Sequence, residues 1–180
     1  MNKTVKPLRG QKLDIKIRNE SKGDVEPIHR VTVLAFRDAP HTDHTEQFIV
    51  KALRQVDALF LSQVAELDGE VIGHVAISPV KVSDGSANWF GLGPISVLPE
   101  YQGKGVGSKL MESALAGLRE KGAEGCVVLG DPSYYGRFGF KVVDGLVFPG
   151  VPVEYFQALS FGSAFPQGEV TYHKAFSAKG

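Results

Sequence analysis

The chain has 180 residues, of which 43% are hydrophobic and 22% are charged, as is typical of one ordinary globular domain with a sizeable core. Twenty Lys and Arg residues balance twenty Asp and Glu residues, and this zero formal net charge argues against nucleic-acid binding driven by bulk charge. The single cysteine, Cys126, excludes an intrachain disulfide and a cysteine-based zinc cluster.

The ends of the chain show how it is organised. No apolar run approaches the roughly 20 residues of a membrane-spanning helix, and the N-terminus lacks the apolar segment of a signal peptide. We therefore expect a cytoplasmic protein with no membrane partner. Residues 1–12 are expected to form a flexible tail, and residues 13–180 a single domain with a core at 13–150 and a C-terminal extension at 151–180.

The first half of the chain predicts a strand, two helices and then more strands. Residues 13–18 alternate apolar and polar, as in a half-buried strand. Apolar positions at helical spacing predict helices over 25–36 and 45–56. Two β-rich runs, 59–67 and 71–80, flank Asp68-Gly69, which is a strong hairpin signal. A further strand is expected over 89–98.

The second half predicts a helix from Ser108 to a stop at Lys121-Gly122, and then a short apolar strand at 125–129. Asp131 as N-cap and Pro132 at the first helical position predict a short helix. Residues 140–143 are expected to be extended, 151–159 helical, and 169–176 a final strand. This order indicates an α/β domain, α+β in some schemes, with a mixed sheet.

The segment at 94–107, PISVLPEYQGKGVG, carries the strongest functional signal: a strand end, a glycine-rich turn and a helix start. Backbone N–H groups at a helix N-terminus bind phosphate, and glycines let a ligand approach the backbone. A P-loop is excluded because Gly103-Lys104 is followed by Gly105. A dinucleotide fingerprint is excluded because Ser108 stands where the third glycine belongs.

Gln102, Gly105 and Gly107 match a different pattern, Gln/Arg-x-x-Gly-x-Gly/Ala. With the Asp68-Gly69 hairpin and the segment YYGRFGF at 134–140, it resembles the GNAT superfamily of acetyl-CoA-dependent N-acetyltransferases over about residues 13–143. The resemblance implies the GNAT fold, with a mixed six- to seven-stranded sheet flanked by helices. It also implies that two central parallel strands, here 89–98 and 125–129, splay apart to hold CoA.

The residues suit such a site. Gly93-Pro94 predicts a bulge that frees the next backbone groups to pair with an extended ligand. The N–H groups after the turn would hold the pyrophosphate, with Lys104 either adding charge at the rim or standing as a solvated lysine. The residues implied to bind CoA are Ile95, Ser96, Val97, Gln102, Gly103, Lys104, Gly105, Val106, Gly107 and Ser108.

The implied reaction is direct attack of a primary amine on the thioester of acetyl-CoA. By the resemblance, the Val97 N–H stabilises the oxyanion and Tyr135 is the general acid for the CoA thiolate. The general base is left open between a water relay and five side chains: Glu66, His74, Asp131, Glu154 and His173.

Two further points concern ligands of the chain. No metal is expected, because His41 and His44 have no obvious further ligands in their loop. Many family members have an Asn before the tyrosine helix that contacts CoA. Here either Asp131 or Ser133 replaces it, or the contact is missing.

The acceptor is not specified beyond an amine on a small molecule or a peptide. The aromatic residues of 151–165 either wall a pocket or cover the sheet. Homodimers are common in the family, and the sequence leaves open whether this chain forms one. Two alternatives to the enzyme are a non-catalytic acyl-CoA-binding sensor or scaffold, and a nucleotide-binding protein that uses the same turn.

Overall fold

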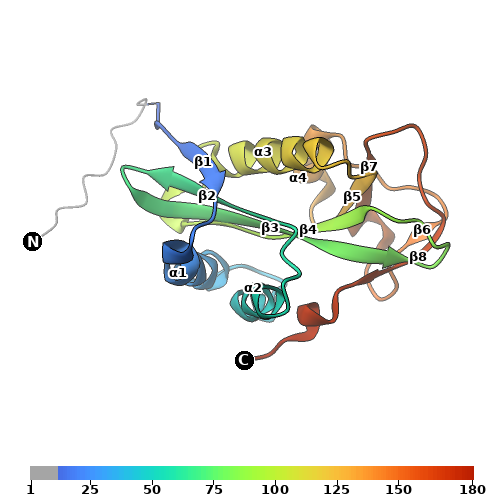
Figure 1. Cartoon of the computed structure of the whole chain (residues 1–180), viewed down its shortest axis with the longest axis horizontal. Helices are drawn as coiled ribbons and strands as arrows, with labels where there is room; N and C mark the ends of the chain where they lie inside the picture. Colours follow the sequence, from blue (N-terminus) through green and yellow to red (C-terminus); the bar gives the residue numbers. More distant parts are fainter. Residues whose placement is uncertain (1–11) are drawn as a thin grey trace, which may run out of the picture.

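A computed structural model of the chain describes residues 12–180, and its centre is an eight-stranded mixed sheet (Figure 1). The expected tail at 1–12 falls almost entirely outside the described residues. Six strands follow one another across the sheet in the order β1 (Lys16–Asn19), β2 (Leu61–Leu67), β3 (Glu70–Val82), β4 (Trp89–Val97), β5 (Gly125–Leu129) and β7 (Phe156–Ser160). Off this path, β8 (Gly168–Tyr172) pairs with the end of β3 and with β6 (Leu146–Val147).

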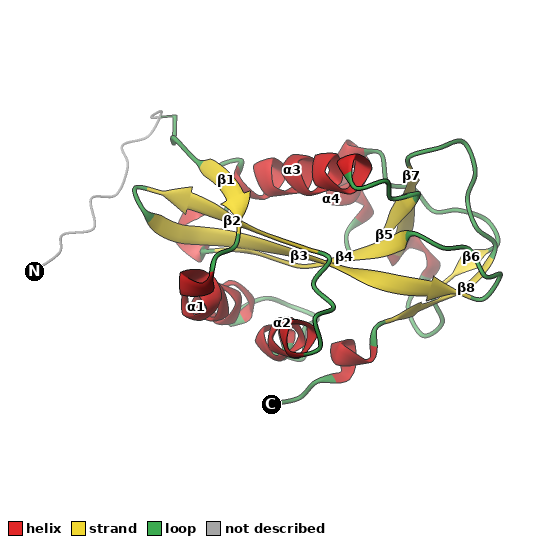
Figure 2. Cartoon of the chain, viewed as in Figure 1, coloured by secondary structure: helices red, strands yellow, loops and turns green. Residues whose placement is uncertain are grey.

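Helices cover both faces of the sheet (Figure 2). α1 (Val25–Phe36) and α2 (Glu46–Gln55) lie on one face, and α3 (Val106–Glu120) lies on the other. The short α4 (Pro132–Tyr135) follows β5. Within the described residues, five 3-10 turns complete the elements: η1 (Lys22–Asp24), η2 (Pro99–Tyr101), η3 (Gly136–Phe138), η4 (Val153–Tyr155) and η5 (Lys174–Ser177).

Apolar burial fixes these layers. The main core joins α1 and α3 to the sheet, and its α3 residues Leu110, Met111 and Leu118 are fully buried. At the other end of the chain, Ala175 of η5 packs with Ile49 and Leu53 of α2. The C-terminal turn is therefore attached to the helical face that carries α1 and α2.

The two central parallel strands pair over a short stretch only. Trp89–Gly91 of β4 pairs with Gly125–Val127 of β5, and no β5 partner is described for the rest of β4. Against β3, Leu92 pairs with Ile77 and Ile95 pairs with Val75, so β4 carries an extra residue at Gly93-Pro94. This confirms the expected bulge and splay, because Pro94 has no N–H to donate to a ladder.

Most predicted elements are confirmed with small shifts. α1 and β5 have the expected bounds, and α3 starts two residues before Ser108. The Asp131 carboxylate accepts the Ser133 N–H at 2.8 Å, which confirms Asp131 as an N-cap.

Two predictions near the C-terminus are wrong. Residues 151–159 do not form a helix, because Phe156–Ser160 pairs antiparallel with the outer edge of β5. The final strand ends at Tyr172 rather than running to Phe176, since 174–177 turn back onto α2. In both places tertiary pairing overrides local preference. The two-residue β6 was not predicted and leaves too short a pattern to detect.

Candidate functional site

A cavity of about 370 Å³ lies where β4 ends and α3 begins; we call it the turn cavity. Its lining comes from the end of β4, from the glycine-rich turn and from α4 with η3. The lining residues are Val97, Tyr101, Gln102, Gly103, Gly105, Gly107, Ser108, Tyr134 and Arg137.

The turn needs its glycines for two reasons. Gly103 and Gly105 have φ angles of 71° and 84°, in the left-handed region that strains other residues. A Cβ added at either would meet no atom within 4 Å, so both backbones face open space. Gly105 is also the N-cap of α3, and the N–H groups that follow it lack intrahelical partners. The turn therefore offers an accessible row of donors suited to an anion.

The free edge of β4 presents the second set of backbone groups. Leu98 donates its N–H to Ile72 of β3 at 2.9 Å, and N–H directions alternate along a strand. The Val97 N–H consequently points away from β3, towards the split from β5, and so does that of Ile95. The Gln102 side chain donates to the Val97 carbonyl on this same edge at 3.0 Å and so ties the turn to the strand.

Ser96 contributes differently from its neighbours. Its side chain is buried beside its β3 partner His74, and its hydroxyl has no partner among the described residues. Its backbone N–H points towards β3, opposite to those of Ile95 and Val97, so Ser96 presents neither its side chain nor its N–H to the split. Val106 can act in the site only through its backbone, because its side chain belongs to the main core.

Lys104 does not line the turn cavity. Its ammonium lies 5.8 Å from the centre of the Tyr101 ring, on an exposed side chain. Three residues not singled out from the sequence do line it: Tyr101, Tyr134 and Arg137. Arg137 stacks on the Tyr134 ring at 4.8 Å and supplies the cavity's cationic group. The YYGRFGF segment contained two of these residues, but only folding brings them against the turn.

The two adjacent tyrosines occupy different surroundings. A Cβ at Gly107 would lie 2.7 Å from the Tyr134 hydroxyl, so this hydroxyl sits over the start of α3. Tyr135 packs against Gly130 and Phe140 instead. The two rings meet edge to face with their centres 5.0 Å apart.

Burial governs the acidity of the groups beside Tyr135. It raises the pKa of the Tyr135 phenol to about 12, with further contributions from Tyr134 and Cys126. Burial also raises the pKa of the Cys126 thiol. Cys126 is therefore an unreactive core residue, as its apolar strand indicates.

Several of the base candidates are engaged elsewhere. Glu66 pairs with Arg18 at 2.7 Å, and the Asp131 carboxylate holds the N–H and hydroxyl of Ser133. His74 contacts the Ser62 hydroxyl at 2.7 Å, and burial lowers its pKa to about 3. His173 accepts the Ala175 N–H at 3.0 Å.

No group of three or more His, Cys, Asp or Glu side chains within residues 12–180 is arranged to hold a metal ion. A search of the same residues finds no helix long and apolar enough to cross a membrane.

Comparisons with known proteins point in one direction. The model of the acetyltransferase (GNAT) family matches residues 26–140. The chain is 49% identical to a GNAT family acetyltransferase from Brucella melitensis, solved in complex with acetyl-CoA, with a TM-score of 0.81 over 90% of this chain and 97% of that one. It is 32% identical to Escherichia coli YhbS, solved in complex with CoA, with a TM-score of 0.82 over 97% and 98% of the two chains.

Curated sequences agree. The uncharacterized N-acetyltransferase YhbS of Escherichia coli K12 is 42% identical over 98 residues, which span 54% of this chain and 59% of that protein. The uncharacterized N-acetyltransferase YjhQ of the same organism is 32% identical over 69% of this chain and 68% of its own length.

Proposed function

The chain belongs to the GNAT acetyltransferase family, and on that premise we propose that it transfers an acetyl group from acetyl-CoA to a primary amine. One observation carries the proposal: an unpaired β4 edge leads directly into an open glycine turn at the start of α3. An extended pantetheine arm matches the edge and a pyrophosphate matches the turn. The 49% identical Brucella protein, solved with acetyl-CoA, supports the same donor.

Donor binding is assigned mainly to backbone groups. The N–H groups of Ile95 and Val97 face the split and can pair with the amides of the pantetheine arm. The N–H groups from Gly103 to Ser108 receive the pyrophosphate, and Arg137 adds a positive charge. Lys104, which lies outside the cavity lining, is assigned a lesser part.

The reaction proposed is direct attack. The amine nitrogen forms a bond to the acetyl carbon, the carbon–sulfur bond breaks, and its electron pair stays on sulfur. The nitrogen then loses one proton and the thiolate gains one. The Val97 N–H, directed into the split, is the donor proposed for the oxyanion.

Tyr135 is the proposed general acid. With a pKa of about 12 it stays protonated at neutral pH, as a donor to the thiolate must. A free thiol has a pKa of roughly 8.5, so the raised pKa of Tyr135 widens the difference in acidity that this proton transfer must overcome. A water relay is the proposed base, since Glu66, Asp131 and His74 are engaged elsewhere.

The test is CoA release by the purified chain from acetyl-CoA against amine classes: amino acids, polyamines, amine antibiotics and peptide N-termini. Acetyl-CoA at ~100 times its dissociation constant should also stabilise the fold by about 2.7 kcal/mol. Stabilisation by ATP or NAD but not by acetyl-CoA would reject the donor assignment. Tight binding without turnover of any amine would favour a sensor or scaffold. A cytoplasmic location and the lack of nucleic-acid partners remain predictions from the sequence, which leaves open whether the chain forms a homodimer.

A further inference from the structure

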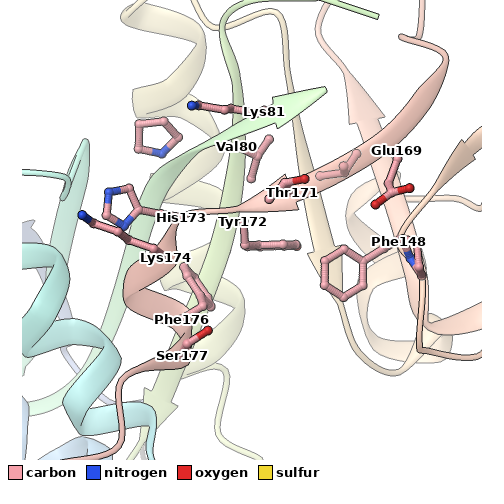
Figure 3. Close-up of a pocket in the computed structure, with 13 residues that line it drawn as sticks. Val80, Lys81, Phe148, Glu169, Thr171, Tyr172, His173, Lys174, Phe176 and Ser177 are labelled. Carbon is pink, nitrogen blue, oxygen red and sulfur yellow. The ribbon is translucent and has the colours of Figure 1, made fainter. Parts of the chain in front are cut away.

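A second cavity, of about 930 Å³, lies beside the C-terminal strand (Figure 3). Three aromatic rings contribute to its wall, and we call it the aromatic cavity. The Tyr172 ring lies 5.3 Å from that of Phe148 and 4.9 Å from that of Phe176, between centres. Its volume is within the range of roughly 300–1,000 Å³ for small-molecule sites. The described donor site does not use it.

Tyr172 connects this cavity to the split between the central strands. Its backbone pairs with Val80, and its ring lies against Gly91 of β4, where an added Cβ would be 2.5 Å from Cε1. Gly91 is the last β4 residue that pairs with β5. The Tyr172 side chain therefore passes from the aromatic cavity to the point where the two strands part.

The hydroxyl of Tyr172 is an unexplained polar group. It is buried and has no hydrogen-bond partner among the described residues, although the ring is only partly buried. Burial raises the pKa of this phenol, with smaller contributions from Cys126 and Tyr135. A buried hydroxyl without a partner costs free energy, so a native one calls for an explanation.

We propose that the aromatic cavity is the acceptor site and that the Tyr172 hydroxyl positions the attacking amine. This inference rests on the proposed function. An N–H of the amine donates to the Tyr172 oxygen and leaves the nitrogen lone pair directed at the thioester carbonyl. The amine thereby supplies the partner that the hydroxyl lacks. The Tyr172 ring already forms part of the cavity wall, so a single side chain joins the cavity to the hydroxyl.

The lining also indicates the class of acceptor. Phe148, Tyr172 and Phe176 favour an apolar or aromatic body. Two exposed cations, Lys81 and Lys174, border the cavity against one carboxylate, Glu169. This balance of charge disfavours polycations. The acceptor is therefore assigned as a monoamine on an aromatic-sized apolar body, with 2-phenylethylamine as a probe and spermidine as its contrast.

The decisive variant is Tyr172→Phe, which removes only the hydroxyl. We expect kcat/KM for 2-phenylethylamine to fall about tenfold, while the KM for acetyl-CoA stays unchanged. Tyr155→Phe, which removes an exposed hydroxyl, is the matched control. Without ligand, Tyr172→Phe should melt at the wild-type temperature or above, since the hydroxyl has no partner to lose. Phe176→Leu, which keeps the hydroxyl, should raise the KM for the amine alone.

The outcomes separate two failures. A wild-type protein that releases no CoA with any amine refutes the proposed function and this inference with it. A wild-type protein that acetylates amines while Tyr172→Phe keeps full kcat/KM overturns this inference alone. Equal or better turnover of spermidine would overturn the assigned acceptor class.

Discussion

The turn cavity and the aromatic cavity gather their residues in different ways. Most of the turn cavity comes from one continuous stretch, 97–108, and its working groups are mainly backbone N–H donors. The aromatic cavity combines the end of β3, the loop at 148–149 and residues 169–177, and its working groups are side chains. Backbone donors demand glycines and a fixed strand end, whereas side chains can change one at a time. The sequence of a donor site built from backbone groups is therefore constrained, whereas the sequence of an acceptor site built from side chains can diverge.

The largest effect is expected for the turn. Gly105→Ala adds a Cβ in the open space proposed for the pyrophosphate, and the Kd for acetyl-CoA should rise roughly 100-fold, or about 2.7 kcal/mol. Isothermal titration measures it. Gly85→Ala is the control, because Gly85 has the same φ of 84° with nothing near its Cβ. Both variants bear the same backbone strain, so equal losses of affinity would reject the turn as the phosphate site.

Catalysis should depend on Tyr135 more strongly than the binding of acetyl-CoA does. Tyr135→Phe is expected to lower kcat roughly 100-fold with an unchanged KM for acetyl-CoA, because the leaving thiolate loses its proton donor. Tyr134→Phe is the matched variant, and its hydroxyl over Gly107 should affect the KM instead. Steady-state kinetics separate the two. A reversed result would transfer the acid role to Tyr134.

Stability should fall in mild acid because of His74, a buried residue of β3 that pairs with Ser96 of β4. The unfolded chain takes up this proton near pH 6.5, and the fold resists it until about pH 3, so stability is lost as the pH falls between these values. At pH 5 the loss relative to pH 7 is about 2 kcal/mol. Denaturant melts at both pH values measure it. Asp24, whose pKa Arg18 holds below its usual range, contributes only in stronger acid.

His74→Gln should remove most of that pH dependence, because the glutamine side chain does not titrate. His29→Gln, at an exposed position, should retain it. An unchanged slope in His74→Gln would show that another group carries the effect.

The smallest effect tests the independence of the two cavities. Ala175→Asp puts a charge where η5 packs on α2, and should release the turn that carries Phe176. We expect kcat/KM for the amine to fall about tenfold, with the Kd for acetyl-CoA within about twofold of wild type. Lys179→Asp, at an exposed position, is the control. A parallel loss of acetyl-CoA affinity would show that the cavities are coupled.

The sequence predicted the donor side well because its signals are local. Glycine spacing, the Gly93-Pro94 break and the Asp131 cap each act within a few residues, and the structure has the bulge, the splay and the cap. The role of Tyr135 has not been tested and stays a prediction.

The C-terminal side was predicted poorly because its determinants are distant in sequence. Residues 156–160 are a strand since β5 has an open edge for them, and no pattern within the segment records that edge. Tyr172 connects the aromatic cavity to the split because its ring lies against Gly91, some eighty positions earlier in the chain. Arg137 likewise joins the turn cavity only through folding.

The extra residue in β4 has a consequence for how this segment can change. The directions of N–H groups and side chains alternate along a strand, so one inserted residue reverses both directions for all residues that follow it. Without it, Ser96 rather than Ile95 and Val97 would direct its N–H into the split, and the apolar pair would leave the α3 face. Side chains here can be exchanged, but deleting a single residue would reverse the direction of every side chain and N–H group in the rest of the strand. Insertions and deletions in this short stretch should therefore be far more damaging than substitutions.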